Sequence, residues 1–422
     1  MPSLLIQGGH VFDPSKSLDM VGDILIENGI ISRIEEKIPA THDFEIINAE
    51  NLHIFPGFMD SHVHFREPGQ EEKETFESGC RAALAGGFTT VIQMPNTSPP
   101  LSTPELVRKY TKDRPIRTRV AASVTINRAG KDLNDLRGLS DAGAVAFTDD
   151  GLPVIKDEIM IQALEISKEI GKRIASHSEN LALSKGGVII ESDFAPALRV
   201  KGIPRKAESS MVERDLKLAS QTGGLLHICH ISTRESIELI EKAKNDGINV
   251  TCEVTPHHLL LTNNAVLEKG ANAKMNPPLA YEEDRLALVD ALNRGIIDII
   301  ATDHAPHTPR EKSLGLEKAP FGVIGLETAF PVLYSKLVLE GFITLGTLIR
   351  CLTISPARCF NLEGGSIAIG SPADLVLIDL NDDFTIDPLK FRSKARNTPF
   401  DGWSVKGRVK LIIIGSKRFP IN

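Results

Sequence analysis

The chain has 422 residues, of which 41% are hydrophobic and 24% charged, and its formal net charge is −7. This composition is typical of a folded globular protein, and the length suffices for a large barrel with an accessory module. Acidic and basic residues are interspersed, and no apolar run approaches the roughly 20 residues of a membrane span, so we expect neither nucleic acid nor membrane as a partner.

Two further features indicate the cellular compartment of the protein. The first residues contain neither a basic segment nor a long apolar core, so no signal peptide is expected. The five cysteines are odd in number and lack C-x-x-C spacing, which argues against a disulfide framework and for a reducing compartment. We therefore expect a cytoplasmic protein.

Strand alternation directs Cys229 away from its neighbour His230, so we interpret Cys229 as a buried filler.

Short strands of alternating or β-branched residues characterise both ends of the chain. They are Leu4–Gln7, Asp23–Ile26, Ile30–Ile34 and Phe44–Asn48 near the N-terminus, and Ala373–Asp379 and Arg408–Ile414 near the C-terminus. Turn residues such as Asn28-Gly29 separate them. Neither end has enough strands for a good sheet of its own. Residues 1–53 and 361–422 are therefore predicted to form one small β-sandwich domain together.

Residues 54–360 alternate apolar, strand-like runs with amphipathic segments of helical length. The predicted strands are Ile54–His64, Thr89–Met94, Thr118–Thr125, Ala144–Asp149, Arg173–His177, Leu225–Ile231, Asn249–Thr255 and Ile297–Thr302. Eight such repeats predict an α/β fold, the closed parallel (β/α)8 TIM barrel. A doubly wound open sheet is the alternative. No glycine-rich nucleotide fingerprint follows any strand, which weakens nucleotide-binding versions of either fold.

Histidines and carboxylates gather at the predicted carboxyl ends of these strands, where such barrels carry their catalytic residues. An isolated His-x-His pair such as His62 and His64 could equally be two partly exposed side chains without a task. Here the other strand ends add Asp149-Asp150, His177, His227, His230, His257-His258 and Asp303-His304. A set that includes at least four imidazoles and two carboxylates on one rim, without a thiolate, indicates a catalytic site for zinc or a similar divalent ion.

Three motifs carry a resemblance to a known family. They are P-G-F-M-D-S-H-V-H-F-R at residues 56–66, Met94-Pro95-Asn96-Thr97, and T-D-H-A-P-H at residues 302–307. They resemble the amidohydrolase superfamily and, within it, the long-chain class of dihydroorotases, over essentially the whole chain. The resemblance implies reversible hydrolysis and cyclisation between (S)-dihydroorotate and N-carbamoyl-L-aspartate in de novo pyrimidine (UMP) biosynthesis. Hydroxide activated by a metal would attack the ring amide.

The same resemblance implies a metal centre of one or two Zn²⁺ ions per subunit. One ion would be held by His62, His64 and Asp303, and the second by His177 and His230, with Asp150 shared between the two. Strand alternation cannot choose between Asp149 and Asp150 at a strand end, and the family pattern favours Asp150. Asp303 is also implied as the general acid and base.

The resemblance further implies a set of substrate-binding residues. They are His64, Arg66, Asn96, Asn276, His307, Phe321 and Gly322. Plainer readings exist, because Asn96 and Asn276 stand near prolines and could be turn residues, and Arg66 could pair with Glu67 or Glu71 on the surface. The histidines at 227, 257, 258 and 304 are interpreted as structural or as supports of the ligands.

One departure from the superfamily pattern separates the alternatives. Hydantoinases, allantoinases and some dihydroorotases place a carboxylated lysine at the end of strand four, whereas this chain reads Thr148-Asp149-Asp150. This favours a dihydroorotase over a hydantoinase- or allantoinase-like cyclic amidase and leaves occupancy of the second metal position open. A catalytically silent structural partner of aspartate transcarbamoylase is a third alternative, against which the complete ligand set argues. An active enzyme could still associate with that transferase, and we expect a homo-oligomer.

The charged segment Thr308–Gly315 follows the strand-eight motif directly and contains proline and glycine. Its predicted place over the rim makes it a candidate for a mobile lid. A solvated loop without a gating role is the alternative.

Overall fold

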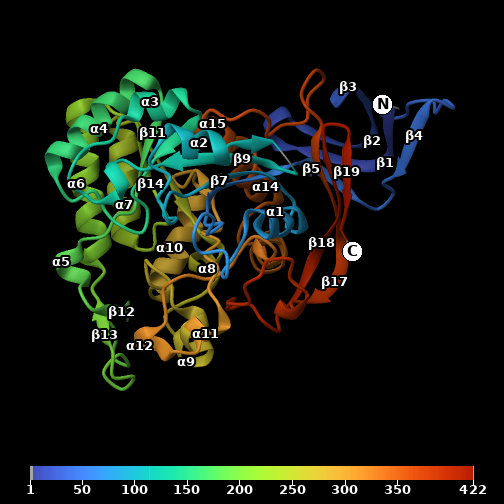
Figure 1. Cartoon of the computed structure of the whole chain (residues 1–422). Coiled ribbons are helices and arrows are strands. Elements are labelled where there is room, and N and C mark those ends of the chain that lie inside the picture. Colours follow the sequence, from blue (N-terminus) through green and yellow to red (C-terminus); the bar gives the residue numbers. More distant parts are fainter. Residues whose placement is uncertain (1–2, 114, 422) are drawn as a thin grey trace.

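Eight parallel strands form the inner wall of a barrel in the computed structural model, which describes residues 3–113 and 115–421 (Figure 1). In chain order they are β6 (Phe58–Val63), β7 (Phe88–Gln93), β9 (Arg117–Ala122), β10 (Ala144–Phe147), β11 (Arg173–Ser176), β14 (Leu226–Ile228), β15 (Val250–Val254) and β16 (Ile299–Ile300). Neighbouring strands in the sheet are also neighbours in sequence, from β6 to β16. The predicted α/β barrel is confirmed.

The barrel closes where the last strand meets the first. The amide of His64 donates to the carbonyl of His304 at 2.9 Å, and Val63 and His304 form a parallel bridge. Strand β16 is shorter than predicted because Thr302 leaves the ladder. Its amide and hydroxyl donate instead to the carboxylate of Asp60, at 3.1 and 2.5 Å. A buried side chain therefore completes the wall where the backbone ladder stops.

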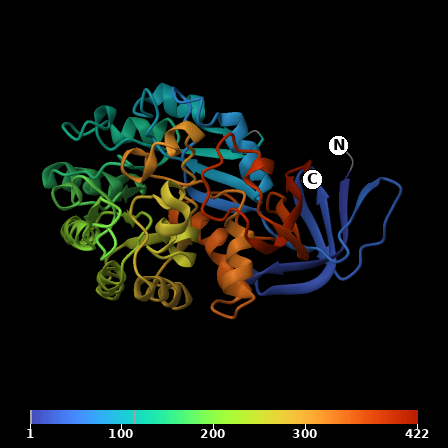
Figure 2. The ribbon, with the colours of Figure 1, turned by 90° about the horizontal axis from the view of Figure 1, so that it is seen from below.

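Helices surround the strands on the outside of the barrel (Figure 2). The main ones are α1 (Phe76–Ala85), α2 (Pro104–Tyr110), α3 (Leu136–Asp141), α4 (Asp157–Ile170), α6 (Lys206–Thr222), α7 (Arg234–Asn245), α10 (Glu282–Asn293), α13 (Ala329–Leu333), α14 (Leu345–Leu352) and α15 (Ile354–Phe360). Helix α7 illustrates their pattern: Thr233 caps its N-terminus, and Ile237, Ile240 and Ala243 are buried on one face. No helix in the described part of the chain is both long and apolar enough to cross a membrane.

Shorter elements lie in the connections and carry much of the rim. They are α5 (Leu181–Ser184), α8 (Pro256–Leu260), α9 (Ala265–Lys269), α11 (Pro309–Lys312), α12 (Gly315–Lys318), β8 (Lys112–Asp113), β12 (Gly187–Ile190) and β13 (Lys201–Ile203). The segment considered as a lid contains α11 and the start of α12. The ammonium of the buried Lys312 donates to the carbonyls of Pro320 at 3.0 Å and Lys274 at 3.4 Å. A lid role for this segment stays a prediction.

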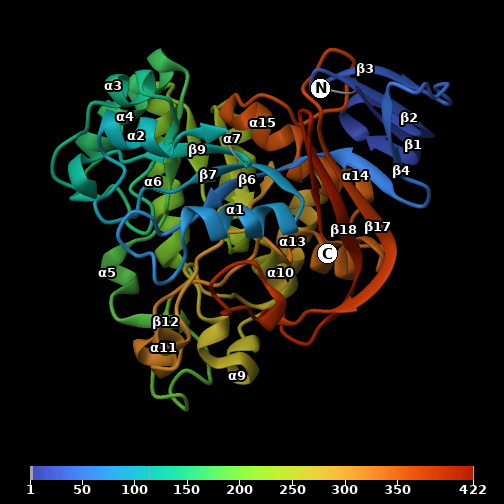
Figure 3. The same ribbon diagram turned by 45° about the vertical axis from the view of Figure 1, so that its right-hand side comes forward.

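Both chain ends build the second sheet, as predicted, beside the barrel (Figure 3). Its strands are β1 (Ser3–Asp13), β2 (Leu18–Glu27), β3 (Ile30–Glu35), β4 (Phe44–Asn48), β5 (His53–Pro56), β17 (Asp374–Thr385), β18 (Ser404–Ile414) and β19 (Lys417–Pro420). Strand β5 joins the two halves, because it pairs parallel with β1 and antiparallel with β17.

The predicted strand Ile54–His64 is in fact two strands in two different sheets. Strand β5 belongs to the terminal sheet, which therefore extends beyond residue 53 to Pro56, and the barrel begins at Phe58. Gly57 makes the break: its amide donates to the carbonyl of Asp374 at 2.8 Å, and a Cβ there would lie 2.3 Å from Thr89. An apolar run alone cannot reveal such a change of sheet, because both halves are buried.

Aromatic rings join the barrel to the terminal sheet. The ring of Phe330, on α13, lies 5.3 Å from that of Phe58, 6.1 Å from that of Phe55 and 5.7 Å from that of Tyr334. An ion pair between Arg117 and Asp374 connects β9 to β17 nearby. Phe330 is fully buried, so its ring contributes through burial and aromatic packing.

We predict that Phe330→Ala destabilises the fold by about 3 to 5 kcal/mol, because it leaves a ring-sized cavity between the two units. Urea denaturation followed by circular dichroism measures the change. Leu389→Ala is the control, since Leu389 is 82% exposed and its truncation should cost little. Equal midpoints for the two variants would contradict the predicted role of this ring.

Candidate metal centre and substrate cavity

Six side chains that sequence reasoning selected lie together at the carboxyl ends of the barrel strands. They are His62 on β6, His64 just after β6, Asp150 after β10, His177 after β11, His230 after β14 and Asp303 after β16. All six are buried. His230 and Asp303 have positive φ angles of 32° and 47°, an unfavourable backbone conformation for these residues that turns their side chains into the centre.

Asp150 lies between the imidazoles. Its Oδ1 is 3.3 Å from Nε2 of His62, 3.8 Å from Nε2 of His230 and 3.9 Å from Nδ1 of His177. Its neighbour Asp149 faces away and accepts hydrogen bonds from the amide and the hydroxyl of Thr125. The choice that strand alternation left open is thus made by the local fold, which directs Asp150 towards the histidines.

Asp303 follows β16, the last barrel strand, and approaches the same cluster from there. Its Oδ1 is 2.9 Å from Nε2 of His64 and 3.6 Å from Nε2 of His62. Burial raises the pKa of Asp303, but the adjacent imidazoles of His64 and His62 outweigh it, so the net pKa lies below its ordinary value. The carboxylate is therefore ionised at neutral pH.

These donors fit a divalent cation. Within these six, two groups of three have ligand atoms close enough for one ion: His62, His64 and Asp303, and His62, Asp150 and His230. Nε2 of His62 and Oδ1 of Asp150 are buried and have no hydrogen-bond partner among the described residues. Nδ1 of His177 and Nε2 of His230 face each other at 3.1 Å. The unpartnered buried atoms of His62 and Asp150 are costly without a cation.

Glu253, on β15, supports the cluster and was not selected from the sequence. Its Oε1 accepts from Nδ1 of His62 at 2.7 Å, and its Oε2 accepts from Ser61 at 2.6 Å and lies 3.2 Å from His227. With its proton on Nδ1, His62 presents Nε2 to the centre. The sequence signal that could have identified Glu253 is its charge inside the apolar run Val250–Val254.

Asn96 and Asn276 also have partners within the site. Oδ1 of Asn96 accepts from Nδ1 of His64 at 2.8 Å, which leaves Nε2 of that ring towards the centre. The amide nitrogen of Asn276 donates at 2.9 Å to Glu179, which also lies 3.1 Å from Nε2 of His177. Both asparagines are thus placed beside metal-ligand candidates, and the plainer reading as turn residues does not describe them.

A cavity of about 190 Å³ adjoins the centre, and all the residues implied for substrate binding line it: His64, Arg66, Asn96, Asn276, His307, Phe321 and Gly322. Arg66 is buried and uses Nε to donate to the carbonyl of Pro306 at 3.1 Å. Burial lowers the pKa of Arg66 to about 10, so it remains charged at neutral pH. Its other N–H groups can therefore receive an anion.

His307 closes one wall of this cavity. Its Nε2 lies 2.7 Å from the carbonyl of Phe321 and 3.4 Å from Nη2 of Arg66. Because a carbonyl only accepts, Nε2 carries the proton and donates to Phe321. Burial and the neighbouring cations Arg66 and Lys312 lower the pKa of His307 to about 2, so the ring is neutral.

Two of the remaining buried histidines, His304 and His258, have partners outside the cluster. His304 lies 3.4 Å from Glu74 and accepts from the amide of Gly325, and His258 lies 2.8 Å from the hydroxyl of Thr255. These contacts suit the structural roles that sequence reasoning gave them. His257 has no partner on Nε2 among the described residues, and burial with the nearby His258 holds its pKa well below the ordinary value.

Comparison with known proteins identifies one family. The profile of the amidohydrolase family matches residues 53–419. A dihydroorotase from Shouchella clausii is 44% identical over 419 residues, which cover 98% of this chain and 97% of that protein. A dihydroorotase from Bacillus caldolyticus is 45% identical, with 97% of each chain covered. Among solved structures, the L-hydantoinase from Arthrobacter aurescens superposes with a TM-score of 0.89 at 26% identity. The superposition covers 99% of this chain and 96% of the hydantoinase chain.

We predict that Glu253→Gln weakens metal affinity by about 10- to 100-fold, because a neutral amide no longer fixes the proton of His62 on Nδ1. Competition between the protein and a zinc-chelating dye measures the affinity without any enzyme assay. Glu238→Gln, an exposed change on α7, is the matched control. Unchanged zinc affinity in Glu253→Gln would show that the carboxylate does not orient the ligand.

Proposed function

This chain belongs to the amidohydrolase family, and from that membership we propose that it is a dihydroorotase. It interconverts (S)-dihydroorotate and N-carbamoyl-L-aspartate, the ring-closing step of de novo pyrimidine (UMP) biosynthesis. The observation that carries the proposal is the joint placement of five of the six candidate ligands and the buried Arg66 around one small cavity, with His62 beside them. Curated relatives named dihydroorotase match almost the full chain at 44–45% identity.

A hydantoinase-like cyclic amidase is the second candidate, because the L-hydantoinase from Arthrobacter aurescens shares the fold closely. Two features favour dihydroorotate. First, the turn after β10 reads Thr148-Asp149-Asp150 and offers no lysine to be carboxylated. Second, a buried guanidinium lining the cavity suits a ring carboxylate, which a hydantoin lacks. The sequence relatives and the site chemistry agree.

We propose Zn²⁺ as the metal, held by His62, His64 and Asp303, with His177 and His230 at a second position and Asp150 shared. The nitrogen and oxygen donor set without thiolate supports this choice. When bound, such an ion lowers the pKa of a water molecule and polarises the amide carbonyl. Glu253, behind His62, then serves to hold that ligand in place.

Asp303 is proposed to move the proton. Its Oδ1 lies at the cavity wall, 2.9 Å from His64, and its carboxylate is ionised. In hydrolysis it accepts a proton from the attacking water, and the protonated carboxyl then donates that proton to the ring nitrogen as the C–N bond breaks. In cyclisation the same atoms act in the reverse order. One carboxylate thus serves both directions.

The substrate carboxylate is proposed to bind Arg66, assisted by Asn96, Asn276, His307 and the backbone at Phe321-Gly322. The N–H groups of Arg66 that Pro306 does not occupy can donate to both carboxylate oxygens. Because these groups bind the carboxylate by hydrogen bonds, they also hold the ring amide near Asp303.

Assembly and location are proposed more broadly. The expected homo-oligomer and an association with aspartate transcarbamoylase stay predictions, as does the cytoplasmic location. The small-molecule substrate follows from the proposed reaction.

We predict that Asp303→Ala lowers kcat for dihydroorotate hydrolysis by about 100-fold or more, because the proton carrier is removed. Turnover is followed by the absorbance of the substrate, with metal content measured in the same preparation. A variant that kept near-normal kcat would refute the proton-transfer role. A wild-type enzyme that stayed active after exhaustive chelation would refute the metal dependence.

We predict that Arg66→Ala raises KM for dihydroorotate by about 10- to 100-fold and changes kcat much less, because one charge-assisted contact to the carboxylate is lost. A panel of dihydroorotate, hydantoin and allantoin tests the substrate class with the wild-type enzyme. Higher kcat/KM for hydantoin than for dihydroorotate would establish the hydantoinase alternative instead.

A further inference from the structure

We propose that Asn397, in the C-terminal segment between β17 and β18, is a positioning residue for the substrate-carboxylate wall of the cavity. The wall consists of Ala305–His307 and Phe321-Gly322. Its assignment as a carboxylate wall rests on the proposed function. The hydrogen bonds that hold it stand independently of the reaction.

One side chain connects the two parts of this wall. Oδ1 of Asn397 accepts from the amide of His307 at 3.2 Å, and Nδ2 donates to the carbonyls of Ala305 at 3.0 Å and Gly322 at 3.1 Å. Its main-chain carbonyl accepts from the amide of Ile324 at 3.0 Å. Asn397 is buried, at 3% exposure, so water cannot readily replace these bonds.

An asparagine suits this position because the wall presents one donor and two acceptors. The amide side chain supplies one acceptor oxygen and two N–H groups, and all three are used. An aspartate of the same shape could still accept from His307, but it would place a carboxylate against the carbonyls of Ala305 and Gly322. The difference between the two residues thus isolates the donor function.

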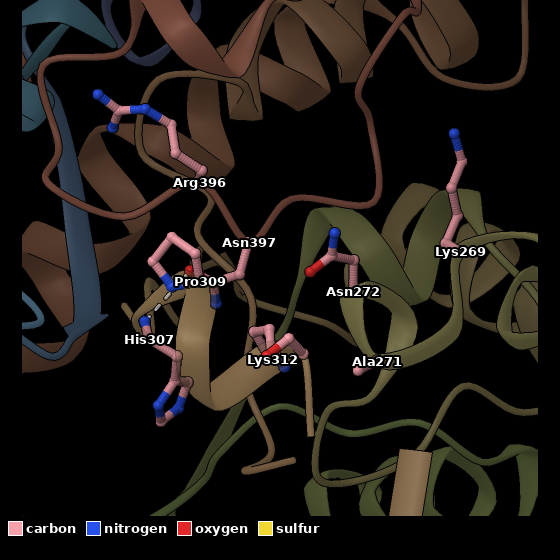
Figure 4. Close-up of a pocket in the computed structure, with 9 residues that line it drawn as sticks. Lys269, Ala271, Asn272, His307, Pro309, Lys312, Arg396 and Asn397 are labelled. Carbon is pink, nitrogen blue, oxygen red and sulfur yellow. Dashed lines mark hydrogen bonds between the residues drawn. The ribbon is translucent and has the colours of Figure 1, made fainter. Parts of the chain in front are cut away.

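Packing alone does not fix the wall, because there is a second cavity behind it. This cavity has a volume of about 300 Å³ and is lined by Lys269, Asn272, Lys312, Arg396 and Asn397, among others (Figure 4). Figure 4 draws the bond between His307 and Asn397 and shows the His307 imidazole pointing away from Arg396 and Lys269. With open space on that side, the loop could retreat if the bonds of Asn397 were lost.

The two halves of the wall would shift together. Nε2 of His307 donates to the carbonyl of Phe321, and the amide of Ala305 donates to the carbonyl of Val323 at 2.8 Å. Gly322 has a φ of 120°, and a Cβ there would lie 2.6 Å from that of Ala305. Loosening Asn397 should therefore displace groups that bind the carboxylate. Five of the candidate metal ligands lie on other strand ends, and Asp303, on the same one, follows Thr302, which is held by Asp60.

The experiment compares the full-length wild type with Asn397→Asp and, in case that variant folds poorly, Asn397→Ser, whose short hydroxyl cannot reach both carbonyls. Asn381→Asp, an exposed asparagine in β17, is the matched control. We expect KM for dihydroorotate to rise about tenfold in both Asn397 variants, with kcat within about twofold of wild type. Backbone hydrogen exchange at residues 305–307 and 322–324 should speed up in the same variants and not in the control.

Two results would overturn the proposal. One is unchanged hydrogen exchange in this wall in the Asn397 variants. The other is a fall in kcat with KM unchanged, which would indicate that the substitution acts on the metal centre or on the fold. A wild-type protein without dihydroorotase activity would instead refute the proposed function, and hydrogen exchange would still decide whether Asn397 holds the wall.

Discussion

Two buried carboxylates facing four buried imidazoles impose the main constraint on this protein. Taking charged and polar groups out of water is costly unless each finds a partner. Asp150 and Asp303 obtain theirs from His62, His64, His177 and His230, yet atoms such as Nε2 of His62 stay without a hydrogen bond among the described residues. A bound cation would therefore stabilise the cluster. The fold must also hold six strand-end residues together although the backbone at His230 and Asp303 is strained.

Polar side chains behind the candidate metal ligands hold these ligands in place by hydrogen bonds. Glu253 fixes the proton of His62, Asn96 fixes that of His64, and Glu179 contacts His177. Asp60 replaces the missing ladder bonds at the barrel closure, and burial raises its pKa to about 7 despite its hydrogen bonds to Thr302 and His62. Each support lies on a strand or directly after one, so the rigid wall of the barrel determines where the ligands point.

The C-terminal segment extends this support from outside the barrel. After β17 the chain returns to the rim, where Ser393 and Lys394 donate to the buried Glu74 and Asn397 bonds to the cavity-lining Ala305, His307 and Gly322. The terminal sheet is joined to the barrel through β5 and the ring of Phe330. The segment that crosses from this sheet to the cavity therefore couples an accessory unit to the geometry of that cavity.

Periodicity and strand-end motifs were enough to predict the barrel, the second sheet from both termini and the histidines and carboxylates on one rim, and the family resemblance singled out His62, His64, His177, His230 and Asp303. Local pattern carries this information because parallel strands place their carboxyl ends on one rim. Tertiary structure decided the rest: the break at Gly57, the orientation of Asp150 rather than Asp149, and the contacts of Glu253 and Asn397. These depend on pairing partners and hydrogen bonds between residues far apart in the chain, which no local spacing encodes.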